Sequence, residues 1–141
     1  MTKVVWVNGN RGIEDALSIR RKVFIEEQSV PEEIEIDDID SFAEHIIIYE
    51  DNKPIATGRI FKRDDNFFLG RIAVLKEYRG KHFGEMTVKM LVKRGLDKGA
   101  EKIIIHAQTA VEEFYKKLGF KSFGEKYYEA GIEHINMIFK K

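Results

Sequence analysis

The sequence is poor in residues that would supply covalent or metal-based chemistry. Its 141 residues include no cysteine and only two prolines. Without cysteine the chain has no disulfide framework, no thiolate ligand for a metal and no thiol nucleophile. The four histidines lack the close helical spacing of a zinc site, so we expect no bound metal.

Long apolar segments are missing as well. No run approaches the ~20 apolar residues of a membrane-spanning helix, and the N-terminus lacks the apolar core of a signal peptide. We therefore expect no membrane insertion, and a cytoplasmic location is compatible with these absences. The sequence also lacks a Gly-x-Ser-x-Gly elbow and a Gly-Lys-Ser/Thr phosphate loop, which excludes two common hydrolase designs.

Charge is balanced in number but uneven along the chain. Lysine and arginine total 24, as do aspartate and glutamate, and this neutral balance argues against nucleic acid binding. Residues 26–44 contain nine acidic and no basic side chains, whereas residues 71–98 contain eight basic and three acidic ones. These runs are either two solvated faces, or one end for an anionic cofactor and another for a cationic acceptor.

No repeat, linker or low-complexity segment divides the chain, so we expect one domain over residues 1–141. Hydrophobic periodicity predicts an α/β (α+β) fold, with a mixed, mostly antiparallel twisted sheet of about seven strands and about four flanking helices. The acidic segment 28–41 is interpreted as a loop or a short irregular helix. Strands are expected at 3–7, 43–50, 55–61, 67–75, 103–105, 121–128 and 132–139, and helices at 12–24, 82–98 and 109–119, the last opened by a capping box of Thr109 and Glu112.

The segment Arg71–Gly84, RIAVLKEYRGKHFG, is the most informative part of the sequence. It places an apolar strand before a basic, glycine-containing loop that opens onto a helix. Free backbone N–H groups and the positive end of the helix dipole then point at one spot. This arrangement predicts a cradle for phosphate groups.

The segments Arg79–Gly84 (RGKHFG) and Phe114–Phe120 (FYKKLGF) resemble the two core motifs of the GNAT superfamily of acetyl-CoA-dependent N-acetyltransferases. The segment Arg79–Gly84 fits the pattern Gln/Arg-x-x-Gly-x-Gly/Ala, except that His82 stands at a glycine position. The segment Phe114–Phe120 fits Phe-Tyr-x-x-Leu-Gly-Phe without departure. The whole chain resembles small bacterial members of the ElaA and YjcF-like type, through VFIEEQSVP (23–31), IDDID (36–40), HAQ (106–108) and GIEHINM (131–137).

The resemblance implies a GNAT fold and transfer of an acetyl group from acetyl-CoA to a primary amine of a small molecule. With no cysteine for an acyl-enzyme, we expect direct transfer within a ternary complex. It further implies that Tyr115 is the general acid for the departing thiolate. The implied cofactor-binding residues are Ile72, Ala73 and Val74 along the pantetheine arm, Arg79, Gly80, Lys81, His82, Phe83 and Gly84 around the pyrophosphate, and Phe114, Tyr115 and Lys117 from the second motif.

The general base is not placed by the resemblance. Many GNAT enzymes carry a glutamate early on the fourth strand, but no acidic residue lies between Phe67 and Val74. A water chain or a residue from another segment must serve instead. The candidates are Glu26, Glu27, Asp38, His106 and His134, of which Glu26 and His106 rank first as catalytic residues and Glu27, Asp38 and His134 as acceptor-binding ones.

Strand pairing suggests one further feature of the acceptor site. If the hairpin turns symmetrically about Asp65, Arg59 lies directly opposite Arg71, and like charges there need an anion between them. That anion is either an internal partner (Asp37, Asp38 or Glu26) or a phosphate or carboxylate of the acceptor. The second alternative makes an amino sugar phosphate a candidate acceptor.

A rival from another class is a catalytically silent module that binds coenzyme A as a sensor. Such a protein would bind the cofactor and never turn it over. The chain is expected to be a monomer or a homodimer, because the edge of the final strands could pair with a second copy or stay unpaired.

Overall fold

The computed structural model describes all residues from Met1 to Lys141 and contains one seven-stranded sheet with the strand order β1-β2-β3-β4-β5-β7-β6. This arrangement confirms the expected fold class. The strands are β1 (Thr2–Asn8), β2 (Glu44–Glu50), β3 (Lys53–Arg63), β4 (Asn66–Val74), β5 (Lys102–Gln108), β6 (Lys121–Glu129) and β7 (Ile132–Lys140).

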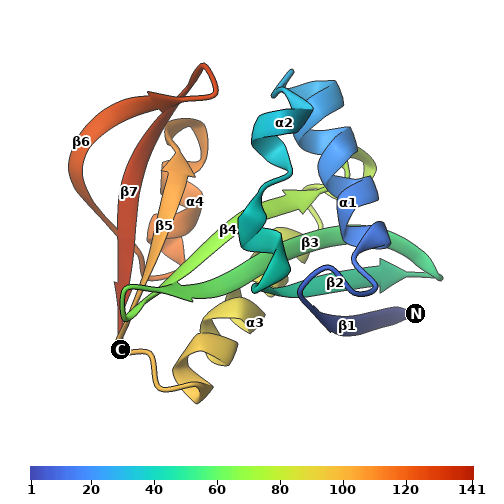
Figure 1. The fold of residues 1–141 in the computed structure, drawn as a ribbon, viewed down its shortest axis with the longest axis horizontal. Coiled ribbons are helices and arrows are strands. Elements are labelled where there is room, and N and C mark those ends of the chain that lie inside the picture. The colour runs from blue at the N-terminus through green and yellow to red at the C-terminus, as the bar shows by residue number, and fades with distance from the viewer.

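Every neighbouring pair of strands is antiparallel except β4 and β5. These two run parallel and pair over only three positions, Phe67–Leu69 with Ile103–Ile105. Beyond Leu69 and Ile105 they separate, and Figure 1 shows β4 leaving β5 diagonally. The sheet therefore has a V-shaped opening at its centre, with the backbone of β4 from Gly70 to Val74 unpaired on the β5 side.

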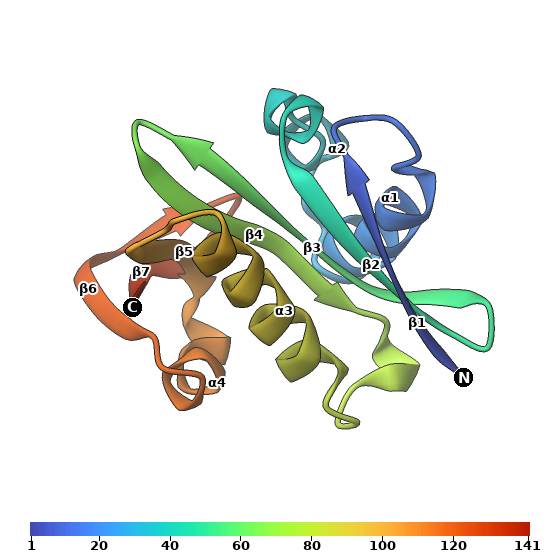
Figure 2. The ribbon, with the colours of Figure 1, turned by 90° about the horizontal axis from the view of Figure 1, so that it is seen from below.

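Helices cover the two faces of the sheet. On one face lie α3 (Phe83–Asp97) and α4 (Glu112–Lys117), and on the other lie α1 (Glu14–Arg20) and α2 (Glu32–Glu35), as Figure 2 shows. The approach of α3 depends on two glycines. A Cβ at Gly58 would lie 2.7 Å from Leu91, and one at Gly95 would lie 2.9 Å from Ile103. These contacts would be too short for any side chain, so the two glycines permit close packing of α3 on the sheet.

The helical segments depart from the expected boundaries in two places. The first helix does not end near Phe24, because α1 continues as a π-helical turn, η1 (Arg21–Glu27). Such turns often occur at functional sites. The acidic segment 28–41 is irregular as expected, with α2 and a 3₁₀ turn, η2 (Asp38–Ser41). Two further 3₁₀ turns are η3 (Lys76–Tyr78) and η4 (Thr109–Val111).

The predicted capping box of Thr109 and Glu112 is wrong. The hydroxyl of Thr109 donates to the carboxylate of Glu133 at 2.8 Å, and Glu112 accepts a hydrogen bond from Ser122. Tertiary partners on β6 and β7 thus take both side chains away from the helix start. The predicted end of this helix is confirmed, since Gly119 adopts a left-handed conformation with φ of 99°.

The predicted register of the β3–β4 hairpin is wrong by one position. Arg59 pairs with Gly70, not Arg71, because the turn is centred on Asp64 and Asp65. The register then shifts between Thr57 and Arg59. Arg71 has a φ of +52°, which marks a β-bulge on β4. The bulge is what lets Arg71 contact the acidic segment on the same side of the sheet as Arg59.

No helix of the structure has both the length and the apolar character needed to cross a membrane.

Candidate active site

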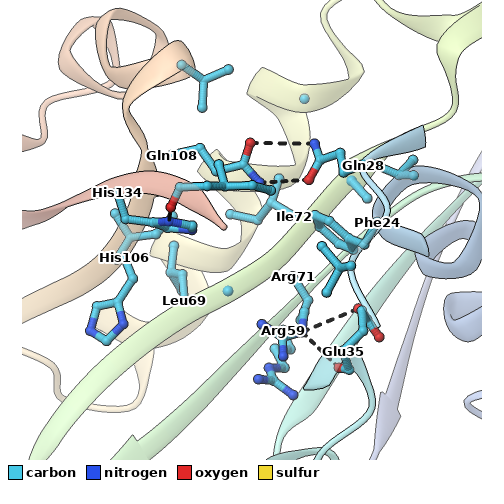
Figure 3. A pocket seen from close by; sticks show the side chains of 18 of the residues that line it. Phe24, Gln28, Glu35, Arg59, Leu69, Arg71, Ile72, His106, Gln108 and His134 are labelled. Carbon is cyan, nitrogen blue, oxygen red and sulfur yellow. Dashed lines mark hydrogen bonds and ion pairs between the residues drawn. The ribbon is translucent and has the colours of Figure 1, made fainter. Parts of the chain in front are cut away.

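A cleft of about 1080 Å³ occupies the opening between β4 and β5. Its walls come from both sides of the sheet, so it is open to the loop before α3 at one end and to η1 and α2 at the other. Figure 3 shows the side chains that meet there. Of the residues proposed from the sequence, those that line it are Arg59, Arg71, Ile72, Ala73, Val74, Arg79, Gly80, His82, Gly84, His106, Phe114 and His134.

The loop before α3 presents unpaired backbone amides. No N–H group between Gly80 and Glu85 donates a backbone hydrogen bond. The helix begins without a side-chain cap, because His82, at the N-cap position, makes no cap hydrogen bond. These amides and the helix dipole converge on the wall of the cleft, as an anion-binding helix N-terminus requires.

The geometry explains why glycines suit this loop. His82 adopts a left-handed conformation with φ of 68°, which glycine enters without steric cost. Its side chain turns outward and lies 3.3 Å from the carboxylate of Glu85. At Gly84 a Cβ would stand 3.4 Å from the ring of Phe114, so the absent side chain leaves room beside the amides.

The side chain of Arg79 has a structural role. Its guanidinium forms two hydrogen bonds with Glu27, at 2.9 and 2.8 Å, and its Nε donates to the carbonyl of Val74 at 2.9 Å. Arg79 therefore joins the phosphate loop to the end of β4 and to η1. Glu27, which was expected to bind the acceptor, is held in this pair and does not line the cleft.

The inner edge of β4 offers hydrogen-bonding groups to the cleft. The amide of Leu75 donates to the carbonyl of Ile55 on β3. Along an antiparallel pair, alternate residues bond to the partner strand, so the N–H and C=O of Val74 and Ile72 point away from β3. Since β5 has already separated, these groups face the cleft. The C=O of Val74 accepts from Arg79, and the other groups remain available to another extended chain.

The second motif forms an aromatic cluster beside this edge. Phe114 lines the cleft, whereas Tyr115 is 6% exposed and packs against Phe114 and Phe120, with ring centroids 5.1 and 5.8 Å away. Burial raises the pKa of the Tyr115 phenol, which keeps the hydroxyl protonated. Three other motif residues do not line the cleft: Lys81 lies over the Tyr78 ring, Phe83 packs on the core, and Lys117 is exposed.

A buried ionic cluster supports the opposite end of the cleft. Arg20, which is 1% exposed, donates to both Glu35 and Asp40. Asp40 also accepts from Arg59 at 2.7 Å. Burial acts to raise the pKa of Asp40, but its hydrogen bonds with Arg20 and the charges of both arginines outweigh that effect and hold the pKa below its ordinary value.

The same cluster occupies the two arginines singled out in the sequence. Arg59 makes two hydrogen bonds with Asp37, at 2.7 and 2.9 Å, and Arg71 donates to Asp37 at 3.2 Å and to the carbonyl of Glu35 at 3.1 Å. The internal partner, Asp37, is thus present. Six acids of the run 26–44 pair with arginines, so the run is not a free acidic surface: Glu27, Glu32, Glu35, Asp37, Asp40 and Glu44.

Two histidines line the cleft at the ends of β5 and β7. His106 is exposed, and its ring packs edge-on against Phe68 and Tyr127. Desolvation lowers the pKa of His106, and the nearby Glu129 carboxylate opposes the shift without reversing it. His134 is buried, with Nδ1 2.7 Å from the carbonyl of Ile132.

The remaining base candidates lie elsewhere. Glu26 is exposed on η1, and Asp38 is exposed on η2, where its carbonyl accepts a hydrogen bond from Ser41. Neither lines the cleft. Of the five residues considered from the sequence, the structure brings His106 and His134 together at the cleft.

Sequence reasoning missed a bridge across the opening. The side-chain amide of Gln108, at the end of β5, donates to the side-chain carbonyl of Gln28 at 2.8 Å. The side-chain amide of Gln28 donates to the side-chain carbonyl of Gln108 over a longer distance, 3.5 Å. Figure 3 shows this pair spanning the cleft between the side of His134 and the side of Phe24. Both glutamines lie in the segments VFIEEQSVP and HAQ that matched the family, which was the signal available.

The residues present fit coenzyme A. Its diphosphate needs converging donors, which the amides of Gly80–Glu85 supply, and its amide-rich arm needs a strand edge, which Ile72 and Val74 supply. Because Gly84 has no side chain, a diphosphate could approach these amides without a steric barrier.

Comparison with known proteins agrees with this geometry. The acetyltransferase (GNAT) domain family matches residues 12–141. The chain is 39% identical over 137 residues to the uncharacterized N-acetyltransferase YjcF of Bacillus subtilis, covering 96% of this chain and 98% of that one. It is 31% identical over 126 residues to the protein ElaA of Escherichia coli, covering 86% and 82%.

Solved structures show the same fold. The crystal structure of Escherichia coli ElaA superposes with a TM-score of 0.88 at 25% identity, over 99% of this chain and 100% of that one. A GNAT family acetyltransferase from Elizabethkingia anophelis, with acetyl-CoA bound, superposes with a TM-score of 0.74 at 14% identity, over 99% and 98%. The chain belongs to the GNAT family and is an acetyltransferase.

Proposed function

We propose that this enzyme transfers the acetyl group of acetyl-CoA directly to the primary amine of a small molecule within a ternary complex. The observation that carries the proposal is the continuity of one cleft, which runs from the free amides before α3, past the open edge of β4, to His106 and His134. A single cavity can thus hold both substrates with their reacting groups adjacent.

The cofactor side of the cleft binds by backbone contacts. The amides of Gly80–Glu85 hold the diphosphate, and the edge of β4 at Ile72 and Val74 pairs with the pantetheine arm. Acetyl-CoA supplies an acetyl group activated as a thioester. The N–H of Val74 would donate to the thioester oxygen and stabilise the negative charge that develops there, a contribution of roughly 3–4 kcal/mol for one such donor.

Proton transfers complete the reaction. The amine nitrogen forms a bond to the acetyl carbon while the carbon–sulfur bond breaks. His106, kept neutral near pH 7 by its lowered pKa, takes the proton that the amine loses. The hydroxyl of Tyr115 donates a proton to the departing thiolate, so the products are an N-acetylated amine and coenzyme A. His106 then releases its proton and Tyr115 regains one through solvent, which restores both side chains.

Two alternatives from the sequence have weaker support. An amino sugar phosphate would need Arg59 and Arg71 for its phosphate, yet Glu35, Asp37 and Asp40 already engage them. A sensor that only binds coenzyme A would need no proton acceptor in the cleft, whereas His106 lines the cleft and can take up a proton. Because their guanidiniums are already paired, we assign Arg59 and Arg71 a structural role on the acceptor side of the cleft.

The proposal is tested by measuring coenzyme A binding by calorimetry and acetyl transfer to a panel of primary amines. Thiol release can be followed with a thiol reagent, because the cysteine-free chain gives no background. We expect binding and amine-dependent release. Tight binding with no release for any amine would establish the sensor instead, and absence of binding would overturn both functions.

A further inference from the structure

A row of aromatic rings crosses the sheet at the acceptor end of the cleft. Phe61 on β3 stacks on Phe68 on β4, with centroids 5.4 Å apart and planes at 13°. His106 on β5 packs edge-on against Phe68 at 6.1 Å, and Tyr127 on β6 against His106 at 6.2 Å. The full row, which we call the aromatic ledge, is Phe42, Phe61, Phe68, His106, Tyr127 and His134.

Strand register explains why these rings share one face. Phe61 pairs with Phe68, and Phe68 pairs with Ile104, so all three side chains point to the same side. His106 follows Ile104 by two residues and keeps that side. Tyr127 pairs directly with His134 on the next two strands. The ledge is therefore continuous across five strands.

Cross-strand aromatic pairs commonly stabilise sheets, and rings with only that role would be buried under other side chains. The ledge is not covered in this way. Phe61 and Phe68 are half-buried, His106 is exposed, and all three line the cleft together with His134. At the far end Phe42, which does not line the cleft, is 53% exposed. Half-buried aromatic rings that line a substrate cleft are suited to edge-to-face contact with another flat ring.

The charges around the ledge favour the same ligand. Arg59 lies over Phe61 but is held by Asp37 and Asp40. Arg63, which also lines the cleft, lies 5.8 Å from the Phe61 ring and pairs with no carboxylate. A planar guanidinium beside the ledge, without a carboxylate partner, can also stack on a bound aromatic ring.

We propose that the acceptor is a primary amine joined by a short aliphatic linker to an aromatic ring, and that the ring lies on Phe61, Phe68 and His106. This inference rests on the proposed acetyl transfer, since His106 is both a ledge ring and the proton acceptor. That double position keeps the amine within a few bonds of the ring, which makes the substrate class an arylalkylamine.

The test compares 2-phenylethylamine with 2-cyclohexylethylamine, which matches it in carbon skeleton but lacks the aromatic ring. We expect kcat/KM to favour the aromatic amine about three- to tenfold, the range that ring–ring contacts add to hydrophobic burial. F61L and F68L should each remove most of this preference. F42L, which removes a ledge ring outside the cleft, should retain it.

The same comparison is made by calorimetry on the complex with coenzyme A, so that binding is judged without turnover. Equal affinity and equal kcat/KM for the two amines would overturn the inference while leaving acetyl transfer intact. Acetylation of a peptide N-terminus in place of either amine would also overturn it. If no amine turned over, the proposed function would fail, and the calorimetric preference would still decide where the ring binds.

Discussion

The two ends of the cleft differ in the groups that they present, which are backbone groups at one end and side chains at the other. The cofactor end consists of backbone groups from one short segment, the amides of residues 80–85 and the edge of β4. The acceptor end consists of side chains that come from segments as distant as Gln28 and His134. Backbone donors look the same for every sequence, whereas a side-chain surface is particular to this chain.

The difference indicates how specificity is divided. On the proposed function, the cofactor is bound by backbone groups that substitutions cannot remove, and His82 in place of glycine leaves these groups in position. The acceptor is selected by ionic, amide and aromatic side chains, so substitutions there should change the substrate or the stability. The following predictions separate these two contributions.

The largest effect is expected in the ionic cluster of the acceptor end. D40A removes the carboxylate shared by Arg20 and Arg59 and leaves buried charge without a partner. Breaking such a pair costs about 3–5 kcal/mol in free energy of unfolding. Urea unfolding measures it, with E33A at an exposed position of the same acidic run as the control. A loss below 1 kcal/mol would show that the cluster is not a stabilising element.

The cluster also predicts an acid dependence. The pKa of Asp40 and of Asp37 is lower in the folded chain than the ordinary aspartate value. Their contribution to stability is therefore complete above that ordinary value and is lost as the pH falls through the lower, folded value. D40A should flatten the fall in stability below about pH 4.

The next effect concerns the proton acceptor. H106N keeps a hydrogen-bonding side chain but removes the base, and it should lower kcat/KM about a hundredfold or more. Because the pKa of His106 is lowered, the acid limb of the wild-type pH profile should have its midpoint below the ordinary histidine value. An unchanged profile in H106N would assign the base to another group, with H134N as the comparison.

A smaller effect is expected at the cofactor end. Y115F removes only a hydroxyl from a packed ring, so it should lower kcat at least tenfold, which is about 1.4 kcal/mol in activation free energy, while coenzyme A affinity stays within about twofold. Steady-state kinetics and calorimetry measure the two quantities. Wild-type turnover in Y115F would refute the role of general acid.

The glutamine bridge gives a matched pair of isosteric variants. Q28E keeps the oxygen that accepts from Gln108, whereas Q108E replaces that donor with a carboxylate oxygen. We expect Q108E to lower kcat/KM for the acceptor about three- to tenfold, the cost of one lost hydrogen bond, and Q28E to change it less than twofold. Equal losses in both variants would mean that the bridge is not oriented as described.

The smallest effect is expected at the left-handed residue of the phosphate loop. H82G removes a conformational cost of about 1–2 kcal/mol and adds flexibility to the unfolded chain, so stability should rise by at most about 1 kcal/mol. H82V should lower it, because a branched side chain fits this conformation poorly. Coenzyme A affinity should change little in H82G, since the amides remain, and calorimetry measures it.

The sequence was most informative where function depends on neighbouring residues. The phosphate loop and its helix lie within residues 71–98, and β-branched runs together with turn residues were enough to locate all seven strands. The bulge at Arg71 has no local signal, because a non-glycine residue with positive φ is held by its tertiary contacts. The bridge, the ionic cluster and the aromatic ledge all depend on which distant segments meet, which a single sequence does not specify.

The short pairing of β4 with β5 affects how firmly the two halves of the sheet are joined before acetyl-CoA binds. With three residue pairs in that seam, the C-terminal strands are joined to the rest of the sheet by little main-chain bonding. If the pantetheine arm of acetyl-CoA pairs with the edge of β4 as proposed, it would act as an additional strand that joins the two halves of the sheet. Slower amide exchange along residues 70–74 and 106–108 on loading would be the visible trace of that closure.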